Sequence, residues 1–105
     1  MADAKGYWVV RVDITNDAAY QQYTAVNGAA FAKFGARFVV RGGAFEIVEG
    51  EARARNVVLE FPSIEAAHAC YHSPEYAAAR ACREGAAVAD IIIIGGYDGP
   101  QPEAP

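Results

Sequence analysis

The chain contains four consecutive isoleucines at positions 91–94, bounded by Asp90 and by the glycines at 95 and 96. β-Branched residues favour strands, and the side chains of a strand alternate between the two faces of its sheet. Four isoleucines in a row therefore place apolar groups on both faces, and residues 57–59 (Val-Val-Leu) nearly repeat the pattern. Because a sheet with one wetted face alternates apolar and polar residues, both faces of this sheet must be covered. We expect helices on one face and a second copy of the chain on the other.

A strand and a long helix open the chain. Residues 7–14 are rich in β-branched and aromatic side chains, which predicts a strand. Residues 15–17 (Thr-Asn-Asp) supply the side-chain oxygens that begin a helix, and Gly35 is a natural end for it. Gly28 inside this helix costs about 1 kcal/mol relative to alanine. One stripe of the helix is apolar except for Asn27; it consists of Tyr20, Tyr23, Asn27, Ala30, Phe31 and Phe34.

Residues 36–49 allow two interpretations because Gly42 and Gly43 divide them. The two glycines suit the centre of a tight hairpin, since both tolerate positive φ. Alternatively they form a bulge inside one long, bent strand that continues through residues 44–49 to a polar loop at 50–54. We favour the bulge because that loop is the better break. A strand over residues 55–61 follows and ends at Pro62.

Two short helices and a last strand complete the chain. Ser63 predicts the first helix start, and Ser73 followed by Pro74 predicts the second. Arg80 and Glu84 stand four residues apart, a spacing that allows an ion pair. The order is β-α-β-β-α-β, the ferredoxin-like α+β arrangement, with a four-stranded antiparallel sheet and its helices on one face. We expect one domain over residues 1–97 and a flexible, Pro-rich tail over 98–105.

Several of these segments resemble the DUF1330 family, a bacterial family of unknown function in the dimeric α/β-barrel superfamily. The resemblance covers about residues 6–97. It implies the same fold and a sheet-to-sheet homodimer, but no activity. Relatives in the superfamily include cofactor-independent monooxygenases, haem-dependent enzymes, lactone isomerases and ligand-binding domains. This chain departs from the family at Cys70, a position where the family more often carries an aromatic residue. The matching residues are 55–63 (Arg-Asn-Val-Val-Leu-Glu-Phe-Pro-Ser), Ala66, Ala67, Tyr71, 73–76 (Ser-Pro-Glu-Tyr), Arg83, the strand 7–12, Tyr20, Tyr23 and 41–43.

Composition excludes several classes of function. Nine Lys and Arg against thirteen Asp and Glu give a net charge of −4, a poor match for nucleic acid or an anionic membrane. The longest apolar run is far shorter than a membrane span of about 20 residues. The first residues show no signal-peptide pattern, so we expect a cytoplasmic protein.

Cys70 and Cys82 are expected to be free thiols. Because no nucleotide-binding or haem-attachment motif is present, no cofactor is expected.

Charged residues interrupt strands that are otherwise apolar. Arg11 and Asp13 share the mixed face of the first strand, Arg37 and Arg41 share a face with Val39, and Glu60 breaks an apolar run. Such groups must be paired, lie at an edge or line a cavity. Two readings stay open: an ion-pair network between protomers, or a pocket in which an arginine grips an anion in bidentate fashion.

Histidines 68 and 72 stand four residues apart, a spacing that can present two metal ligands on one helix face. Ala69 occupies the position of the glutamate found in zinc proteases, and a third ligand would have to come from elsewhere. We therefore expect surface or capping histidines and no metal.

If the protein has a site, we expect it between the helices and the sheet. His72 and Glu60 are the candidate catalytic residues because they can move protons near neutral pH. Arg41, Tyr76, Arg83 and Tyr20 are the candidate substrate-binding residues. Three functions remain open: a cofactor-independent enzyme acting on a small acidic or aromatic molecule, a non-catalytic ligand-binding module, and a structural dimerisation module.

Overall fold

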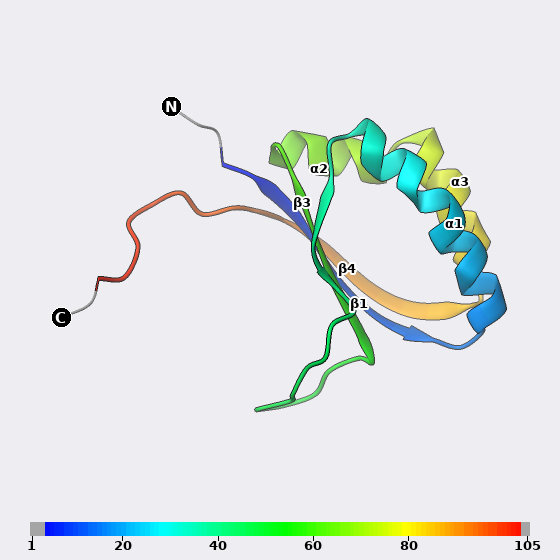
Figure 1. The fold of residues 1–105 in the computed structure, drawn as a ribbon. Helices are drawn as coiled ribbons and strands as arrows, with labels where there is room; N and C mark the ends of the chain where they lie inside the picture. The colour runs from blue at the N-terminus through cyan, green and yellow to red at the C-terminus, as the bar shows by residue number, and fades with distance from the viewer. Residues whose placement is uncertain (1–3, 104–105) are drawn as a thin grey trace.

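The computed structural model describes residues 4–103, which form a four-stranded antiparallel sheet covered on one face by three helices (Figure 1). The strand order is β2-β3-β1-β4, so the first strand lies between the third and the fourth. The expected α+β fold class, a four-stranded antiparallel sheet with its helices on one face, is confirmed. The elements are β1 (Gly6–Ile14), α1 (Asp17–Lys33), β2 (Arg37–Arg41), β3 (Arg55–Phe61), α2 (Ile64–Tyr71), α3 (Pro74–Arg83) and β4 (Ala87–Gly95).

Trp8 on β1 forms the centre of the core and has no exposed surface. Its ring centroid lies within 5.7 Å of the rings of four residues from α1, β3, α2 and α3, and its Nε1 donates to the carbonyl of Ala67 on α2 over 2.9 Å. The hydrogen bond satisfies the polar end of a buried indole. The four aromatic partners are Phe31, Phe61, Tyr71 and Tyr76.

Local side-chain contacts set the helix boundaries as expected. The side chain of Asn16 accepts from the amide of Ala19, and Ser63 and Ser73 cap α2 and α3 in the same way. Helix α1 continues unbroken through Gly28. The expected ion pair between Arg80 and Glu84 is not formed; Arg80 instead donates to the hydroxyl of Tyr71 over 2.9 Å.

The region after β2 corrects our interpretation of residues 36–49. The bulge lies at Val39, where the register between β2 and β3 shifts, and not at the glycines. Residues 44–49 do not continue the strand. They belong to an irregular, mostly exposed segment, residues 42–54, which we call the arm. The arm leaves the sheet on the side away from the helices (Figure 1). A tight hairpin is excluded as well, because residues 44–49 form no strand that pairs back onto β2.

The sheet face opposite the helices, which we call the outer face, is largely apolar. Ile92 and Ile94 on β4 are 55 % and 48 % exposed, and Val40 on β2 and Val88 on β4 are similarly exposed. Val9 on β1 pairs with both Val58 and Ile92, which brings these side chains together. The outer face therefore has the apolar character expected of a covered surface.

Residues after β4 contribute little to the core. Tyr97 is 70 % exposed, and its hydroxyl donates to the carbonyl of Pro100 over 2.7 Å. The expected tail extends to Pro105, of which residues 104–105 lie outside the described part, as does the start of the expected domain at residues 1–3. Within residues 4–103, no helix is both long and apolar enough to cross a membrane.

Two glycines predict opposite stability changes when replaced by alanine. A Cβ on Gly6 would lie 2.5 Å from the Cα of Ile64 and from the carbonyl of Ser63, so Gly6→Ala should lower the free energy of unfolding by roughly 2 kcal/mol or more. A Cβ on Gly28 would meet no atom within 4 Å, so Gly28→Ala should raise the free energy of unfolding by about 0.5–1 kcal/mol. Urea unfolding midpoints measure both, and equal effects of the two substitutions would contradict the close approach at Gly6.

Candidate functional site

A small cavity lies between α1 and the inner face of β1, β2 and β3, in the layer where a site was expected. Its volume of about 30 Å³ leaves room for one or two water molecules. The floor is apolar, and the polar groups come from α1 and from the ends of β2 and β3 next to the arm. The lining residues are Trp8, Val10, Tyr20, Tyr23, Thr24, Asn27, Phe31, Phe38, Arg41, Arg55, Val57 and Leu59.

The bulge at Val39 directs Arg41 to this cavity. Arg37 pairs with Glu60 on the outer face, whereas Arg41 pairs with Val57, whose side chain is buried on the inner face. Regular alternation would have put both arginines on one face, and the extra residue of a bulge reverses that relation. The expectation that Arg37 and Arg41 share a face is therefore wrong. The Cζ atom of Arg41 lies 4.3 Å from the ring centroid of Phe38, so the guanidinium stacks on that ring.

Arg55, the first residue of β3, forms the second basic wall of the cavity. Its Nε is buried and has no hydrogen-bond partner among residues 4–103. The guanidinium packs against Gly42: a Cβ at that position would lie 2.6 Å from Nη1, and Gly42 has a φ of +67°. Both observations explain why glycine stands there.

Neither cavity arginine has an acidic partner within the described residues. Arg37 forms an ion pair with Glu60, and Arg53 forms ion pairs with Asp13 and Asp90. The side-chain nitrogens of Arg41 and Arg55, in contrast, lie more than 4.0 Å from every described carboxylate oxygen. No acidic residue lines the cavity. The protein carries a net charge of −4, so this cavity is a local basic site in an acidic molecule.

Helix α1 supplies phenol and amide groups to the cavity wall. The hydroxyls of Tyr23 and Tyr76 lie 2.8 Å apart, and Arg83 Nη2 donates to the Tyr76 hydroxyl over 3.4 Å. Burial and the neighbouring Tyr76 hydroxyl raise the pKa of Tyr23 far above its ordinary value. Burial also raises the pKa of Tyr20, although the charges of Arg55 and Arg83 oppose the rise. Both phenols are therefore neutral hydrogen-bond donors at physiological pH.

The structure divides the expected site residues among four places. Tyr20 and Arg41 line the cavity, and Tyr76 and Arg83 form the layer behind Tyr23. His72 is exposed and lies in a separate groove between α2 and β4. Glu60 lies on the outer face, where it accepts from the hydroxyl of Tyr7 over 2.8 Å and pairs with Arg37 at 3.5 Å. The two expected proton-transfer residues are thus outside the cavity.

Sequence reasoning missed four polar lining residues: Tyr23, Thr24, Asn27 and Arg55. Asn27 was visible as the polar exception in an apolar helical stripe, and a buried amide of this kind marks a special environment. Arg55 gave no such signal, because an arginine at the start of a strand is ordinary. Its role depends on Gly42, which only the fold brings against it.

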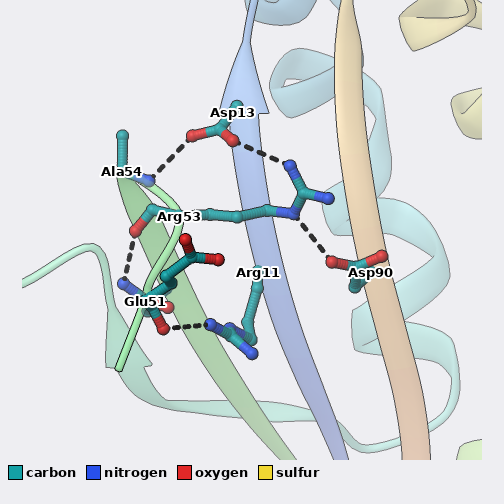
Figure 2. Close-up of polar contacts among 7 residues, drawn as sticks. Arg11, Asp13, Glu51, Arg53, Ala54 and Asp90 are labelled. Atoms are coloured by element: carbon teal, nitrogen blue, oxygen red, sulfur yellow. Dashed lines mark hydrogen bonds and ion pairs between the residues drawn. The ribbon is translucent and has the colours of Figure 1, made fainter. Parts of the chain in front are cut away.

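A second polar cluster ties the arm to the outer face (Figure 2). Arg53 donates to Asp90 over 2.7 Å and to Asp13 over 2.8 Å, and the amide of Ala54 donates to the other oxygen of Asp13. The Ala54 amide and the Arg53 guanidinium lower the pKa of Asp13. Arg11 donates to the carbonyl of Glu51 over 3.1 Å. These charges pair within one chain.

The cysteines and histidines form no metal site in the described part of the chain. No group of three or more His, Cys, Asp or Glu side chains is arranged to hold an ion there. Cys70 and Cys82 are free thiols, and Cys70 is fully buried. Burial, with a smaller contribution from Glu75, raises the pKa of Cys70 to about 12, so it is not a reactive thiolate.

A family model matches residues 5–97, nearly the whole chain. Its description is Domain of unknown function (DUF1330). The chain belongs to the DUF1330 family. The match confirms the expected resemblance over the same stretch of sequence. No curated protein sequence matches this DUF1330 chain.

Two solved structures illustrate the similarity of fold. The protein of unknown function RPA0582 from Rhodopseudomonas palustris superposes with a TM-score of 0.74 at 20 % identity, over 92 % of this DUF1330 chain and 85 % of its own. SnoaB from Streptomyces nogalater, a cofactor-independent oxygenase, superposes with a TM-score of 0.60 at 14 % identity, over 95 % and 99 % of the two chains. At these identities the likeness shows the fold alone.

The buried phenol of Tyr23 predicts a specific loss of stability in alkali. Its pKa in the folded chain lies above the unfolded value of about 10, so its contribution is fully present below that pH and is lost as pH rises. The urea midpoint of the native protein should therefore fall as the pH rises above about 10, and Tyr23→Phe should reduce that fall. Tyr97→Phe, which alters an exposed phenol, is the control. If the urea midpoint of Tyr23→Phe falls with pH as steeply as that of the native protein, the loss of stability does not come from Tyr23.

Proposed function

We propose that this DUF1330 protein binds the anionic end of a small organic acid between Arg41 and Arg55. The observation that carries the proposal is the pair of cavity arginines without acidic partners, one of which has a buried and unpartnered Nε. A buried donor without an acceptor costs roughly 1–3 kcal/mol, and a carboxylate would supply acceptors for both guanidinium groups.

The dimensions and the lining specify how such a ligand is held. A volume of about 30 Å³ admits a small charged group, so the rest of the ligand lies at the mouth beside Phe38 and Thr24. Phe38 is 38 % exposed there and offers a flat apolar surface. Tyr20 and Asn27 present neutral donors to the charged group. An acid with a planar apolar body therefore fits better than a polar, flexible one.

Cofactor-independent catalysis on the same ligand is the second candidate, and two observations favour it. Two phenol hydroxyls line the cavity, and SnoaB, a protein of the same fold, is a cofactor-independent oxygenase. Against it, the cavity lining contains no His, Asp, Glu, Lys or Cys, and burial keeps Tyr20 and Tyr23 protonated. His72 and Glu60, the expected proton-transfer residues, lie elsewhere. Reversible binding is therefore the stronger proposal.

We also propose that the protein works as a homodimer that buries the outer face. The exposed apolar residues Val40 of β2 and Val88, Ile92 and Ile94 of β4 support this, because monomers seldom expose a continuous apolar surface. The ion pairs of Arg53 with Asp13 and Asp90 reduce the cost of desolvating these charges there.

Ligand binding can be tested by calorimetry with benzoate as the probe and neutral benzamide as the comparison. We expect benzoate to bind and benzamide not to bind. Arg55→Met should weaken benzoate binding about tenfold or more, the effect of losing a charged hydrogen bond. Arg37→Met is the matched control, because Arg37 is on β2 but faces outward and is 72 % exposed. Equal binding of benzamide, or equal losses in both variants, would contradict the proposal.

The dimer can be tested by sedimentation velocity. The native chain should sediment as a dimer at micromolar concentration. Ile92→Asp should shift it towards monomer because the carboxylate would be desolvated on the outer face. Val26→Asp, an equivalent change on the exposed surface of α1, should leave the protein a dimer. A native monomer at this concentration would refute the dimer while leaving the ligand proposal intact.

A further inference from the structure

Arg83, in the last turn of α3, is a third arginine near the cavity without an acidic partner. No described carboxylate oxygen lies within 4.0 Å of its side-chain nitrogens. Its guanidinium lies over the ring of Tyr23, with Cζ 5.3 Å from the centroid, and donates to the Tyr76 hydroxyl over 3.4 Å. Its charge also opposes the rise in the pKa of Tyr20. Arg83 therefore acts on the cavity although it does not line it.

The hydrogen bonds that begin at Arg83 run in one direction, towards the cavity. A guanidinium can only donate, so the Tyr76 hydroxyl accepts from Arg83. Tyr76 has no exposed surface, and the Tyr23 hydroxyl, 2.8 Å away, is the one acceptor that the described residues offer to its proton. Tyr76 therefore donates to Tyr23, and the proton of Tyr23 is left for another acceptor.

The acceptor for the Tyr23 proton must lie in the cavity. Tyr23 lines the cavity wall and, with Tyr76 as the donor of their shared bond, none of the described residues accepts a hydrogen bond from it. The side chain of Asn27 opposes the rise in the Tyr23 pKa, as a donor does, so it does not take the proton. A hydroxyl that accepts from a chain ending in a cation is itself a stronger donor. Tyr23 thus presents a polarised O–H to the occupant of the cavity.

The cavity offers more donors than a single carboxylate can use. A carboxylate presents about four lone-pair positions, and two bidentate guanidinium groups can fill them. The hydroxyls of Tyr20 and Tyr23 and the amide of Asn27 remain as further donors, and no described Asp or Glu lines the cavity. A ligand that matches this lining brings another oxygen that accepts and does not donate.

The size of the cavity places that oxygen next to the carboxylate. A volume of about 30 Å³ admits only a few heavy atoms, so both acceptor groups must belong to one small head group. A ketone oxygen on the carbon beside the carboxylate meets this limit and is a pure acceptor. A hydroxyl at the same carbon would add a proton to a lining that is already rich in donors.

We propose that the ligand of the cavity is an aryl 2-oxo acid, whose carboxylate lies between Arg41 and Arg55 and whose ketone oxygen accepts from Tyr23. This rests on the anion binding proposed above and specifies the chemical class of the anion. Tyr76 and Arg83 are positioning residues: they orient and polarise the Tyr23 hydroxyl without touching the ligand. The aryl group lies at the mouth of the cavity.

Calorimetry with two closely matched acids tests the proposal. Phenylglyoxylate and phenylacetate carry the same ring and carboxylate and differ in a C=O against a CH₂. The native protein should bind phenylglyoxylate about tenfold more tightly, because phenylacetate leaves the Tyr23 donor unpaired. Mandelate, which has a hydroxyl in place of the ketone, should bind more weakly than phenylglyoxylate. Tyr23→Phe should bring the affinity ratio of phenylglyoxylate to phenylacetate to about one.

Arg83→Met tests the positioning role while leaving the Tyr23 hydroxyl in place. The variant should lower the affinity ratio by about threefold or more, and should have no further effect on it in the Tyr23→Phe background. The ketone stretch of bound phenylglyoxylate in the infrared should move to higher frequency in Arg83→Met, since its hydrogen bond is weaker. Arg80→Met is the matched control: Arg80 lies on α3 and donates to the phenol of Tyr71 over 2.9 Å, but Tyr71 does not line the cavity.

The outcomes separate this proposal from the proposal of anion binding. If the two acids bind equally well and Arg55→Met weakens both, the 2-oxo acid is refuted and anion binding stands. The 2-oxo acid is also refuted if Tyr23→Phe keeps the native ratio, or if mandelate binds more tightly than phenylglyoxylate. Equal ratios in Arg83→Met and Arg80→Met refute the positioning role. If neither acid binds, both proposals fail.

Discussion

The indole of Trp8 lies on the central strand of the sheet, and the placement of all three helices depends on what it contacts. Its ring packs on α1 through Phe31, on α2 through Tyr71 and on α3 through Tyr76, and its nitrogen is bonded to the α2 backbone. Trp8 also lines the cavity between α1 and the sheet. Fold and candidate site therefore rest on the same buried residue.

Two arginine pairs show how strand geometry divides the molecule into an inner and an outer side. Arg53 and Arg55 are two residues apart, yet Arg53 pairs with carboxylates on the outer face and Arg55 lines the cavity. Arg37 and Arg41 are divided in the same way by the bulge at Val39. In both cases the outer arginine has an acidic partner and the inner one has none. This asymmetry is the physical basis for assigning anion binding to the inner side and association to the outer side.

The arm connects these two sides. It begins directly after Arg41 and ends directly before Arg55, so the ligand site lies at its base, while its middle carries exposed apolar residues. A ligand held between the two arginines would restrain both ends of the arm.

The sequence alone determined the order of elements, the helix boundaries at Ser63 and Ser73, and the need to cover both faces of the sheet. These depend on local capping, on periodicity and on the four isoleucines of β4, all of which act within short stretches of chain. Two candidate site residues, Tyr20 and Arg41, also line the cavity that was expected between helices and sheet. The tertiary structure decided the rest. A one-residue bulge sets which face Arg41 occupies, and Gly42 receives the guanidinium of Arg55 only because β2 and β3 pair. Residues 44–49 remain unpaired because a strand needs a neighbour, and no short stretch of sequence contains its own neighbour.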